Sequence, residues 1–410
     1  MFDVAVIGAG PSGLVCTLKL LEQGYKVALI EKDKFPREKV CGDALGSDVL
    51  TQMEKLPEAV QERFNNEPNA YKINGTRLYA PNGKSIFVDY TPVSKKLNRP
   101  MGVVMPRKSF DLVLFDSLNK HENLSLYLET KVTDIVFGEN DVRIIAGDKE
   151  IDAKMVCVAN GDGSKFSERL VGVKKNAKHY CQAVRAYYEG VEGFHNKGFI
   201  DLYFFNELLP GYLWVFPMAD GRSNVGLGIM KSKREKFNYN LSELLDNYIH
   251  ENPLLASRFK NAKRVTPLKG AGIPLASKKY KLSGKRFLVL GDAGALVDPL
   301  LGEGISYAMK SGRIASEACH IALSKNDFSQ GTLSYYDQEV NRILRKEFKS
   351  NYRIQKLIRK PGLFNFVANK AQQFGKQHYM VTHPHADKII KRKLLNPLTY
   401  FKLVQRKFRR

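Results

Sequence analysis

A run of glycines near the start of the chain is the feature whose spacing points most directly to chemistry. An apolar strand pattern, the turn GAGPSG and a segment with apolar residues at helical spacing follow one another between residues 3 and 23. In this context Gly8 permits the tight turn, Gly10 lets the backbone approach a diphosphate, and Gly13 allows the helix to pack closely on the strand. The helix N-terminus offers free N–H groups to an anion. The segment therefore predicts a dinucleotide-binding turn, which also includes Ser12.

Acidic residues follow two further predicted strands. The strand expected over residues 26–30 ends at Glu31, about 20 residues beyond the first glycines, where a carboxylate can accept hydrogen bonds from a ribose hydroxyl. A strand expected over residues 285–290 ends beside Asp292, and a helical pattern follows through Cys319. Which dinucleotide binds depends on this second segment.

Residues 286–305, with the sequence RFLVLGDAGALVDPLLGEGI, resemble the second FAD fingerprint of flavoproteins that share the p-hydroxybenzoate hydroxylase fold. The resemblance implies that Asp292 bonds the ribityl chain or ribose of FAD. It also implies that a helix start faces the flavin, where the helix dipole stabilises negative charge. Arg107 opens an R-x-x-F-D pattern of the same family, and Asp162 and Gly163 match its DG motif. The remaining cofactor contacts expected on this resemblance are Val132, Gly302, Gly304 and Ile305.

Two further segments resemble the signatures of the geranylgeranyl reductase family. They are FPREKVCGDAL over residues 35–45, and PGYLWVFP over residues 210–217 with NVGLG shortly after it. The resemblance implies that Cys41, Gly42 and Ala44 form a loop against the flavin, since small residues permit close approach. Cys41 is also a candidate catalytic thiol, although no second cysteine lies nearby in the sequence to resolve it.

The segments between the flavin motifs have the alternation of β-strands and predict one antiparallel sheet. Such a sheet, inserted into an α/β flavin domain, would form a wall over the flavin ring and leave a pocket between the domains. Trp214, the only tryptophan, either belongs to the core of this sheet or lines an apolar tunnel. Tyr212 is the second candidate for a catalytic proton donor. The residues expected to bind the substrate are Tyr212, Trp214 and Phe216.

Length and composition are those of a folded protein with two or three domains. The 410 residues are 43% hydrophobic and 26% charged, which excludes a disordered chain, a collagen-like repeat and a disulfide miniprotein. We expect an α/β protein with a Rossmann-type FAD-binding domain, an inserted antiparallel β-sheet substrate domain and a helical basic C-terminus. The FAD-binding domain is expected over residues 1–72, 98–175 and 266–325, the substrate domain over 73–97 and 176–265, and the C-terminal region over 326–410.

The excess of positive charge lies near the C-terminus. The chain has 65 Lys and Arg against 42 Asp and Glu, a net charge of +23, and residues 351–410 contain fifteen basic residues and one acid, Asp387. Residues 388–410 interleave apolar and basic side chains, as do amphipathic helices that lie on anionic membranes. A solvated face packed on the protein and a nucleic-acid site are the alternatives, but no nucleic-acid motif accompanies the basic residues. We therefore expect an anionic membrane surface, and not nucleic acid, as a partner.

The cysteines and the start of the chain bear on its location. Five scattered cysteines without a CxxC pair favour a reducing compartment. The N-terminus lacks the features of a signal peptide, and no apolar run reaches the roughly 18 residues of a membrane span. His383 and His385 lack acidic or cysteine partners nearby, so we expect no metal site. The expected location is cytoplasmic and peripheral on the inner face of the membrane; the sequence does not specify an oligomeric state.

Together the motifs imply an FAD-dependent reductase that saturates C=C bonds of an isoprenoid chain on a lipid, quinone or pigment precursor. Such a reaction needs a hydride from the flavin and a proton for the other carbon. NADPH or another reductant is expected to supply the electrons, although no second GxGxxG marks a dedicated domain for it. A flavin-dependent monooxygenase or halogenase on the same fold is the first alternative. The second is a membrane adaptor in which FAD has only a structural role.

Overall fold

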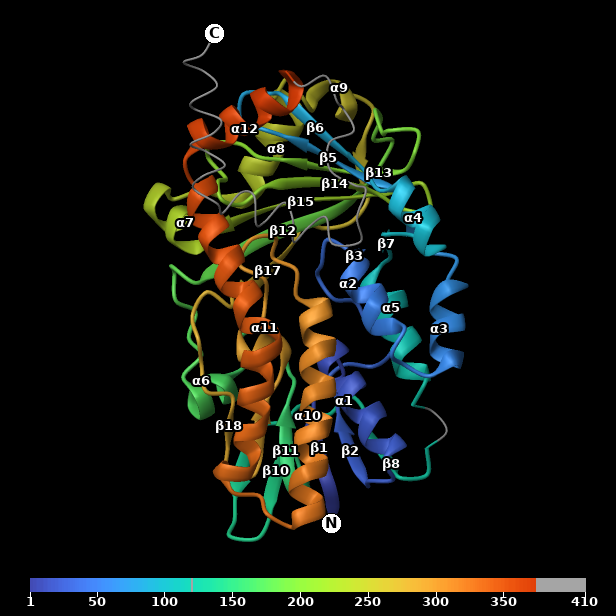
Figure 1. The fold of residues 1–410 in the computed structure, drawn as a ribbon, viewed down its shortest axis with the longest axis vertical. Helices are drawn as coiled ribbons and strands as arrows, with labels where there is room; N and C mark the ends of the chain where they lie inside the picture. Colours follow the sequence, from blue (N-terminus) through green and yellow to red (C-terminus); the bar gives the residue numbers. More distant parts are fainter. Residues whose placement is uncertain (119–120, 374–410) are drawn as a thin grey trace.

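The computed structural model describes residues 1–118 and 121–373, so the segment 388–410 that is predicted to bind membranes lies outside the described residues. In the described part, two large sheets lie one above the other along the long axis of the molecule (Figure 1). Two long helices, α10 (Ile305–Lys325) and α11 (Gln330–Ile358), run beside each other along the lower half, and α11 continues to the upper sheet.

The lower sheet has a parallel centre that is buried on both faces. Its strands follow the order β18-β19-β11-β1-β2-β8, and the antiparallel strands β10 and β9 extend it from β11. Val4 and Val6 of β1 pack in the core with α1 and α10, whereas Ala5 and Ile7 pack against residues of β9 and β10. This double burial explains why β1 and its parallel neighbours are apolar. The strands are β1 (Phe2–Ile7), β2 (Val27–Ile30), β8 (Leu124–Tyr127), β9 (Asp134–Phe137), β10 (Val142–Ala146), β11 (Lys149–Val158), β18 (Ser283–Gly284) and β19 (Phe287–Val289).

The upper sheet follows the order β16-β12-β15-β14-β13-β5-β6, with β17 paired to β12. Its neighbours are antiparallel except for β13 and β5, which run parallel. One sheet therefore forms where we expect it, but it is mixed, because β5 arrives from a distant part of the chain. The strands are β5 (Gly75–Tyr79), β6 (Ser85–Asp89), β12 (Tyr180–Glu189), β13 (Phe199–Tyr203), β14 (Leu213–Pro217), β15 (Ser223–Met230), β16 (Lys263–Arg264) and β17 (Lys269–Pro274).

A three-stranded sheet and short helices complete the fold. Strand β7 (Gly102–Val104) pairs with both β3 (Ala44–Gly46) and β4 (Tyr71–Lys72). The 3₁₀ turn η1 (Gly291–Gly294) precedes α10. The remaining helices are α1 (Pro11–Glu22), α2 (Ser47–Met53), α3 (Glu58–Asn65), α4 (Thr91–Leu97), α5 (Arg107–Asp116), α6 (Lys165–Val171), α7 (Lys231–Phe237), α8 (Leu241–Glu251), α9 (Ala256–Phe259) and α12 (Pro361–Gln373).

The architecture confirms the predicted fold class: a Rossmann-like α/β unit, an inserted sheet and a C-terminal region that is helical as far as residue 373. One detail differs from the sequence-based division. Strand β17 lies beyond residue 265, where we expect the substrate sheet to end, yet it pairs with β12 along six residues. None of the described helices is long and apolar enough to cross a membrane.

Candidate active site

The glycine turn between β1 and α1 is built on close backbone approaches. Gly8 has a φ of +102°, and a Cβ on it would lie 2.6 Å from the carbonyl oxygen of Ala159. A Cβ on Gly13 would lie 1.9 Å from the carbonyl oxygen of Gly8. In contrast, a Cβ on Gly10 would meet only the Arg37 guanidinium, at 3.9 Å. The space beside Gly10, at the N-terminus of α1, fits the diphosphate of a dinucleotide.

Glu31 lies beside this turn and is held by the backbone. Its buried carboxylate accepts hydrogen bonds from the N–H groups of Ala9, at 2.7 Å, and Asp33, at 3.1 Å. The Thr130 N–H donates to the Glu31 carbonyl at 2.9 Å, which brings the segment containing Val132 next to the end of β2. The structure therefore brings Glu31 and Val132, two predicted cofactor contacts, to one edge of the sheet.

The two predicted FAD motifs, almost 300 residues apart, meet where α1 packs on α10. A Cβ on Gly312 of α10 would lie 2.2 Å from the Ser12 carbonyl oxygen, and one on Gly291 would lie 2.9 Å from Ser12 Oγ. The missing side chains at these two glycines allow the close packing. Ser12 is thus buried at the junction of the two motifs.

Asp292 presents a carboxylate without a hydrogen-bond partner among the described residues. It accepts no hydrogen bond from any side chain or N–H group in the described ranges, and one of its oxygens lies 3.1 Å from the Cβ position of Gly304. Burial raises the pKa of Asp292, and the positive charges of Lys39 and Arg107 oppose this shift. A carboxylate held beside the start of α10, which begins at Ile305 after Gly304, fits a hydroxyl group of a bound ligand.

Asp162 and Gly163, the residues of the predicted DG motif, lie on the loop between β11 and α6. The Tyr180 hydroxyl donates a hydrogen bond to the Asp162 carboxylate, and Asp162 is close enough to Asp292 to raise its pKa. Gly163 has a φ of +76°. This loop therefore borders the position of Asp292.

A buried ion pair fastens α5 to the residues around the site. Arg107 donates from Nε and Nη2 to the two carboxylate oxygens of Asp111, each at 2.8 Å. Asp111 also pairs with Arg37 at 3.2 Å, and the Arg107 backbone N–H donates to Asp43 at 3.3 Å. Arg107, a predicted cofactor contact, thereby links the glycine turn to the loop that begins at Cys41.

Asn224 joins this loop to the aromatic wall of the upper sheet. Its amide nitrogen donates to the Cys41 carbonyl, at 2.9 Å, and to the Asp43 carboxylate, at 2.8 Å. Its amide oxygen accepts from Trp214 Nε1 at 2.9 Å. The Tyr187 hydroxyl donates to the same Asp43 carboxylate at 2.7 Å. Asp43, Tyr187 and Asn224 were not predicted from the sequence as site residues. The position of Asp43 and Asn224 inside the two family signatures could have indicated their role.

Gly42 lies against the aromatic wall. A Cβ on it would lie 3.5 Å from the Phe216 ring and 3.6 Å from the Trp214 indole. On the other side of the indole, a Cβ on Gly226 would lie 2.4 Å from Trp214 Cζ2. Two glycines therefore permit the flat packing of Trp214, which is 8% exposed.

The two candidate catalytic groups differ in what holds them. Burial and the neighbouring Asp43 carboxylate raise the pKa of the Cys41 thiol, while Arg107 lowers it, so the thiol remains protonated at neutral pH. The Tyr212 hydroxyl donates to the Leu301 carbonyl, and burial raises its pKa as well. Neither group is a ready base or nucleophile; both hold a proton.

An apolar pocket of about 400 Å³ lies between the upper sheet and the turn that precedes α10. Tyr212 and Trp214 line it from the sheet, and Gly302 lines it from the turn. This places two predicted substrate contacts and one predicted cofactor contact around a single, mostly apolar space. Phe216 packs on Gly42 and is not part of the lining. The other apolar side chains of the lining are Cys181, Pro210, Met230, Ile273, Leu275, Pro299, Leu300 and Leu301.

Helix α11 holds the turn on which this pocket depends. Asn351 donates to the Asp298 carboxylate, and Gln355 donates to the Pro299 carbonyl; both amide side chains are buried. Asp298 in turn accepts from the backbone N–H of Leu301 at 3.0 Å. The sequence did not single out Asn351 or Gln355, because they lie among the many charged residues of α11.

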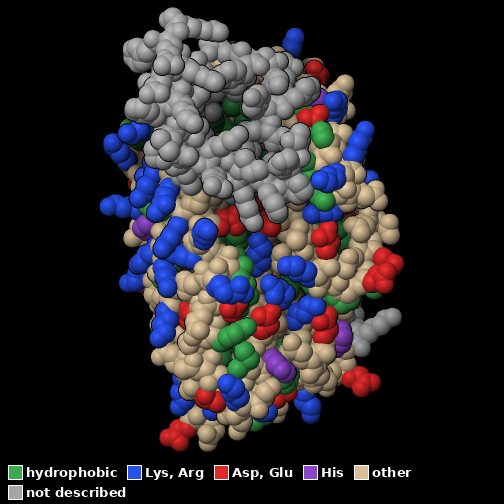
Figure 2. All heavy atoms as spheres, viewed as in Figure 1, with side chains coloured by type: hydrophobic (Ala, Val, Ile, Leu, Met, Phe, Trp, Pro, Cys, Tyr) green, Lys and Arg blue, Asp and Glu red, His purple; other side chains and the backbone are tan. Residues whose placement is uncertain are grey.

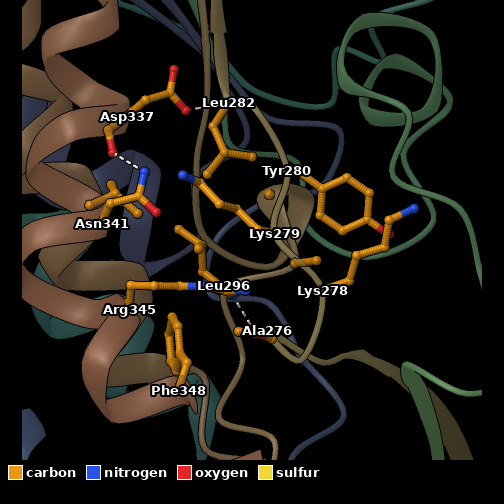
Figure 3. Close-up of a pocket in the computed structure, with 13 residues that line it drawn as sticks. Ala276, Lys278, Lys279, Tyr280, Leu282, Leu296, Asp337, Asn341, Arg345 and Phe348 are labelled. Carbon is orange, nitrogen blue, oxygen red and sulfur yellow. Dashed lines mark hydrogen bonds between the residues drawn. The ribbon is translucent and has the colours of Figure 1, made fainter.

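A second pocket, of about 350 Å³, lies between α11 and the segment 276–282 (Figure 3). Lys279, Asn341 and Arg345 give it a polar and basic lining, and Arg345 donates to the Ala276 carbonyl at 3.2 Å. None of the predicted site residues lines this pocket. The apolar pocket beside Trp214 is therefore the one that suits a hydrocarbon chain next to the cofactor motifs.

Comparison with known proteins decides the family. Residues 179–271 match the model of the geranylgeranyl reductase catalytic domain, and residues 2–197 match that of the pyridine nucleotide-disulphide oxidoreductases. A digeranylgeranylglycerophospholipid reductase of Methanococcus vannielii is 32% identical over 346 residues, which are 82% of this chain and 81% of the relative. The protein of the same name from Methanosarcina acetivorans is 30% identical over 80% of this chain and 77% of its own. This chain belongs to the geranylgeranyl reductase family.

Solved structures agree with this geranylgeranyl reductase fold. A geranylgeranyl bacteriochlorophyll reductase-like protein from Thermoplasma acidophilum superposes with a TM-score of 0.79, at 22% identity and over 94% of both chains. A flavin-dependent brominase superposes with a TM-score of 0.68, at 20% identity, over 90% of this chain and 93% of its own. At such identities the likeness concerns the fold alone.

Membership in the geranylgeranyl reductase family confirms that the protein is a flavin-dependent oxidoreductase. The open space at Gly10 and the carboxylate of Asp292, which has no hydrogen-bond partner in the described ranges, fit that cofactor. The residues that would hold it are those of the glycine turn, Glu31, Asp292 and the start of α10.

Proposed function

We propose that the enzyme is an FAD-dependent reductase that saturates C=C bonds in an isoprenoid chain of the geranylgeranyl type, carried by a lipid, quinone or pigment precursor. The observation that carries this proposal is the apolar pocket bounded by Trp214 on one side and Gly302 on the other. The names of the relatives, digeranylgeranylglycerophospholipid reductases, support a lipid as the carrier of the chain.

The lining of the pocket would bind the chain and exclude water. When bound, the flavin supplies the hydride for the alkene. Burial of each methylene group contributes about 0.8 kcal/mol, so several isoprene units give substantial affinity without a polar contact. Trp214, fixed by Asn224 and by two glycines, keeps one wall of the pocket rigid, and Tyr212 is tied to the turn through Leu301. A rigid wall holds the isoprenoid chain in place, so that its reacting carbon atoms keep a fixed position in the site.

NADPH or another reductant would supply the electrons. The described residues contain one glycine turn of the dinucleotide type, and it belongs to the predicted FAD site. We therefore propose that the electron donor docks transiently on the enzyme. Anaerobic titration of the oxidised enzyme with NADPH, followed by flavin absorbance, tests this: bleaching supports NADPH, and its absence points to another carrier.

A flavin-dependent halogenase or monooxygenase is the second candidate, because a flavin-dependent brominase shares the fold. The two functions differ in their use of oxygen. Reduced enzyme that consumes O₂ with formation of a halogenated or hydroxylated product would support the second candidate. Reduced enzyme that saturates an isoprenoid lipid under anaerobic conditions would exclude it.

We also propose that the protein lies on an anionic membrane on its cytoplasmic side. Basic side chains gather on the flank formed by α7 and α11 (Figure 2). On α11 exposed basic residues recur at intervals of three and four, so they form one stripe along the helix. This stripe consists of Arg342, Lys346, Lys349, Arg353 and Lys356. Together with the nine basic residues of segment 388–410, it supports electrostatic binding.

Co-sedimentation with vesicles tests the membrane proposal. Full-length protein should bind anionic vesicles better than neutral ones, and added salt should weaken the binding. Deletion of residues 388–410 should reduce this binding while flavin content stays the same. Equal binding of the truncated and full-length proteins would overturn the role of that segment.

Analysis of lipids by mass spectrometry tests the reaction itself. Lipids from cells with the gene should carry two more hydrogen atoms for each reduced double bond than lipids from cells without it. A strain that expresses Gly10→Val, which should lack the cofactor, serves as the matched control. Identical lipid masses in the wild-type and control strains would contradict the proposed function.

A further inference from the structure

Glu303 stands out among the residues around the cofactor site. It lies between Gly302 and Gly304, two predicted flavin contacts, directly before α10. Its Oε1 atom is enclosed by protein and has no hydrogen-bond partner, and it is the only carboxylate oxygen in the described part of the chain with both properties. The same atom lies 3.9 Å from the Cβ position of Gly46, at the end of the strand that follows the Cys41 loop.

An ionised carboxylate is unstable in such a position, whereas a protonated one is not. Desolvation of an unpaired charge is costly, and the usual outcome is that the group binds a proton. Burial, and then the negative charge of Asp48, raise the pKa of Glu303 to about 7, while the Ser306 hydroxyl and Lys310 oppose the shift. The carboxyl group can therefore change its protonation state near neutral pH.

The charged groups that face Glu303 come from three elements. Asp48 of α2 and Lys310 of α10 form an ion pair with each other, so Lys310 is not free to pair with Glu303. Asp298 also faces Glu303 and adds negative charge, but its carboxylate accepts hydrogen bonds from the turn and from Asn351. Glu303 also raises the pKa of the phenols of Tyr212 and Tyr307, so both lie close to it.

We propose that Glu303 takes up a proton when the bound flavin is reduced, and that this proton completes the saturation of the alkene. Only one part of this inference rests on the proposed function, namely that the proton is finally accepted by an alkene. The uptake step itself depends on flavin reduction alone. It follows from electrostatics, because extra negative charge on a ligand beside Gly302 and Gly304 favours the protonated form of a neighbouring carboxyl group.

The atoms and electrons of the step balance. The π bond of the alkene breaks and two C–H bonds form. One bond uses the hydride, with its two electrons, from the reduced flavin, which becomes oxidised. The other uses the proton of Glu303, whose O–H bond breaks and leaves a carboxylate. The electron donor of the enzyme reduces the flavin again, and Glu303 takes its next proton from solvent.

The ion pair beside Glu303 offers a path for that proton. The Asp48 side chain is 45% exposed, whereas that of its partner Lys310 is 11% exposed. Asp48 thus connects the charged groups around Glu303 with solvent, and we include it in the proposed route of the proton. Glu303 itself needs no direct opening to water.

Proton uptake during flavin reduction tests this proposal without any isoprenoid. The midpoint potential of the bound flavin is measured from about pH 7 to 9, where an ionised Glu303 is available to bind a proton. Wild-type enzyme should take up one more proton per two electrons than Glu303→Gln. Glu317→Gln is the matched control, because Glu317 lies on α10, the helix that begins just after Glu303, and pairs with Arg313 at 2.7 Å. This control should behave as the wild type does.

The outcomes separate the two proposals. Equal proton uptake by wild type and Glu303→Gln would overturn the role of Glu303, even if the enzyme reduces isoprenoids. A difference in uptake without isoprenoid reduction would support Glu303 and contradict the proposed function. If both proposals hold, Glu303→Gln should lower turnover by about 10²- to 10⁴-fold, the range of general acid catalysis, with little change in flavin content.

Discussion

The glycine turn of residues 8–13 and the aromatic wall of β14 and β15 both border the candidate site, but different interactions fix them. In the turn, backbone atoms approach one another so closely that Gly8 and Gly13 leave no room for a side chain. In the wall, the side chain of Asn224 connects Trp214 with Asp43, and Asp43 lies 181 residues before Asn224 in the sequence. The nucleotide end of the site is thus a local backbone structure, and the substrate end is a long-range network of side chains.

Two substitutions within the glycine turn give the largest expected effects and should differ from each other. Gly10→Val should leave the apoprotein folded, because the new side chain meets only Arg37, but it should abolish flavin retention by filling the diphosphate space. Gly13→Val should prevent stable folding, because its Cβ would overlap the Gly8 carbonyl oxygen. Thermal unfolding of the apoproteins and flavin content after purification measure the two effects. If Gly10→Val and Gly13→Val had the same stability and the same flavin content, the proposal that Gly10 makes room for the cofactor while Gly13 packs on the backbone would be wrong.

Asn224→Ala tests the network of the wall. The substitution leaves Trp214 Nε1 without its buried partner and removes one of the hydrogen bonds that the Asp43 carboxylate accepts, so we expect a loss of about 1–3 kcal/mol in the free energy of unfolding. Chemical denaturation measures this loss. Asn261→Ala, at an exposed position, should change stability by less than about 0.5 kcal/mol. An Asn224→Ala protein as stable as the wild type would show that apolar packing alone holds the wall.

Asp292→Ala should weaken flavin binding and leave the fold intact. The carboxylate has no hydrogen-bond partner among the described residues, so its removal breaks no bond within that part of the protein. Loss of a charge-assisted bond to a ligand hydroxyl costs about 1.5–3 kcal/mol, roughly tenfold to a hundredfold in affinity. Titration of apoprotein with FAD gives the dissociation constant, and Asp148→Ala at the surface is the control. Unchanged affinity would remove Asp292 from the cofactor site.

The last expected effect is on the pH dependence of stability. The pKa of Glu303 rises from its ordinary 4.5 to about 7 on folding, so the folded state binds the proton more tightly than the unfolded state. The stability that this provides is present below about pH 4.5 and is lost as the pH rises through 7. Apoprotein of the wild type should therefore lose more stability between about pH 5 and 8 than Glu303→Gln. Parallel pH profiles in chemical denaturation would contradict the raised pKa.

The sequence determined those parts of the protein whose function depends on local backbone geometry. The turn Gly8–Gly13 requires particular residues at particular positions, so its spacing predicts strand, turn and helix, and the structure has them in that order. Most strands of the upper sheet were predictable for a similar reason, because their alternation reflects burial on a sheet, but β16 and β17 lie outside the predicted strands. The position of Trp214 in the wall followed from the same pattern.

Only the tertiary structure decided which distant side chains meet. Asn351 and Gln355 appear in the sequence as polar residues of a charged helix, but the packing of α11 aims both at the turn before α10. Asp43 becomes part of the wall because Tyr187 and Asn224 reach it from neighbouring strands. Glu303 has an unusual carboxyl group because the folded chain encloses its Oε1 atom, which has no hydrogen-bond partner among the described residues. Hydrogen bonding and burial of this kind depend on the positions of residues far apart in the chain, and composition and spacing do not record them.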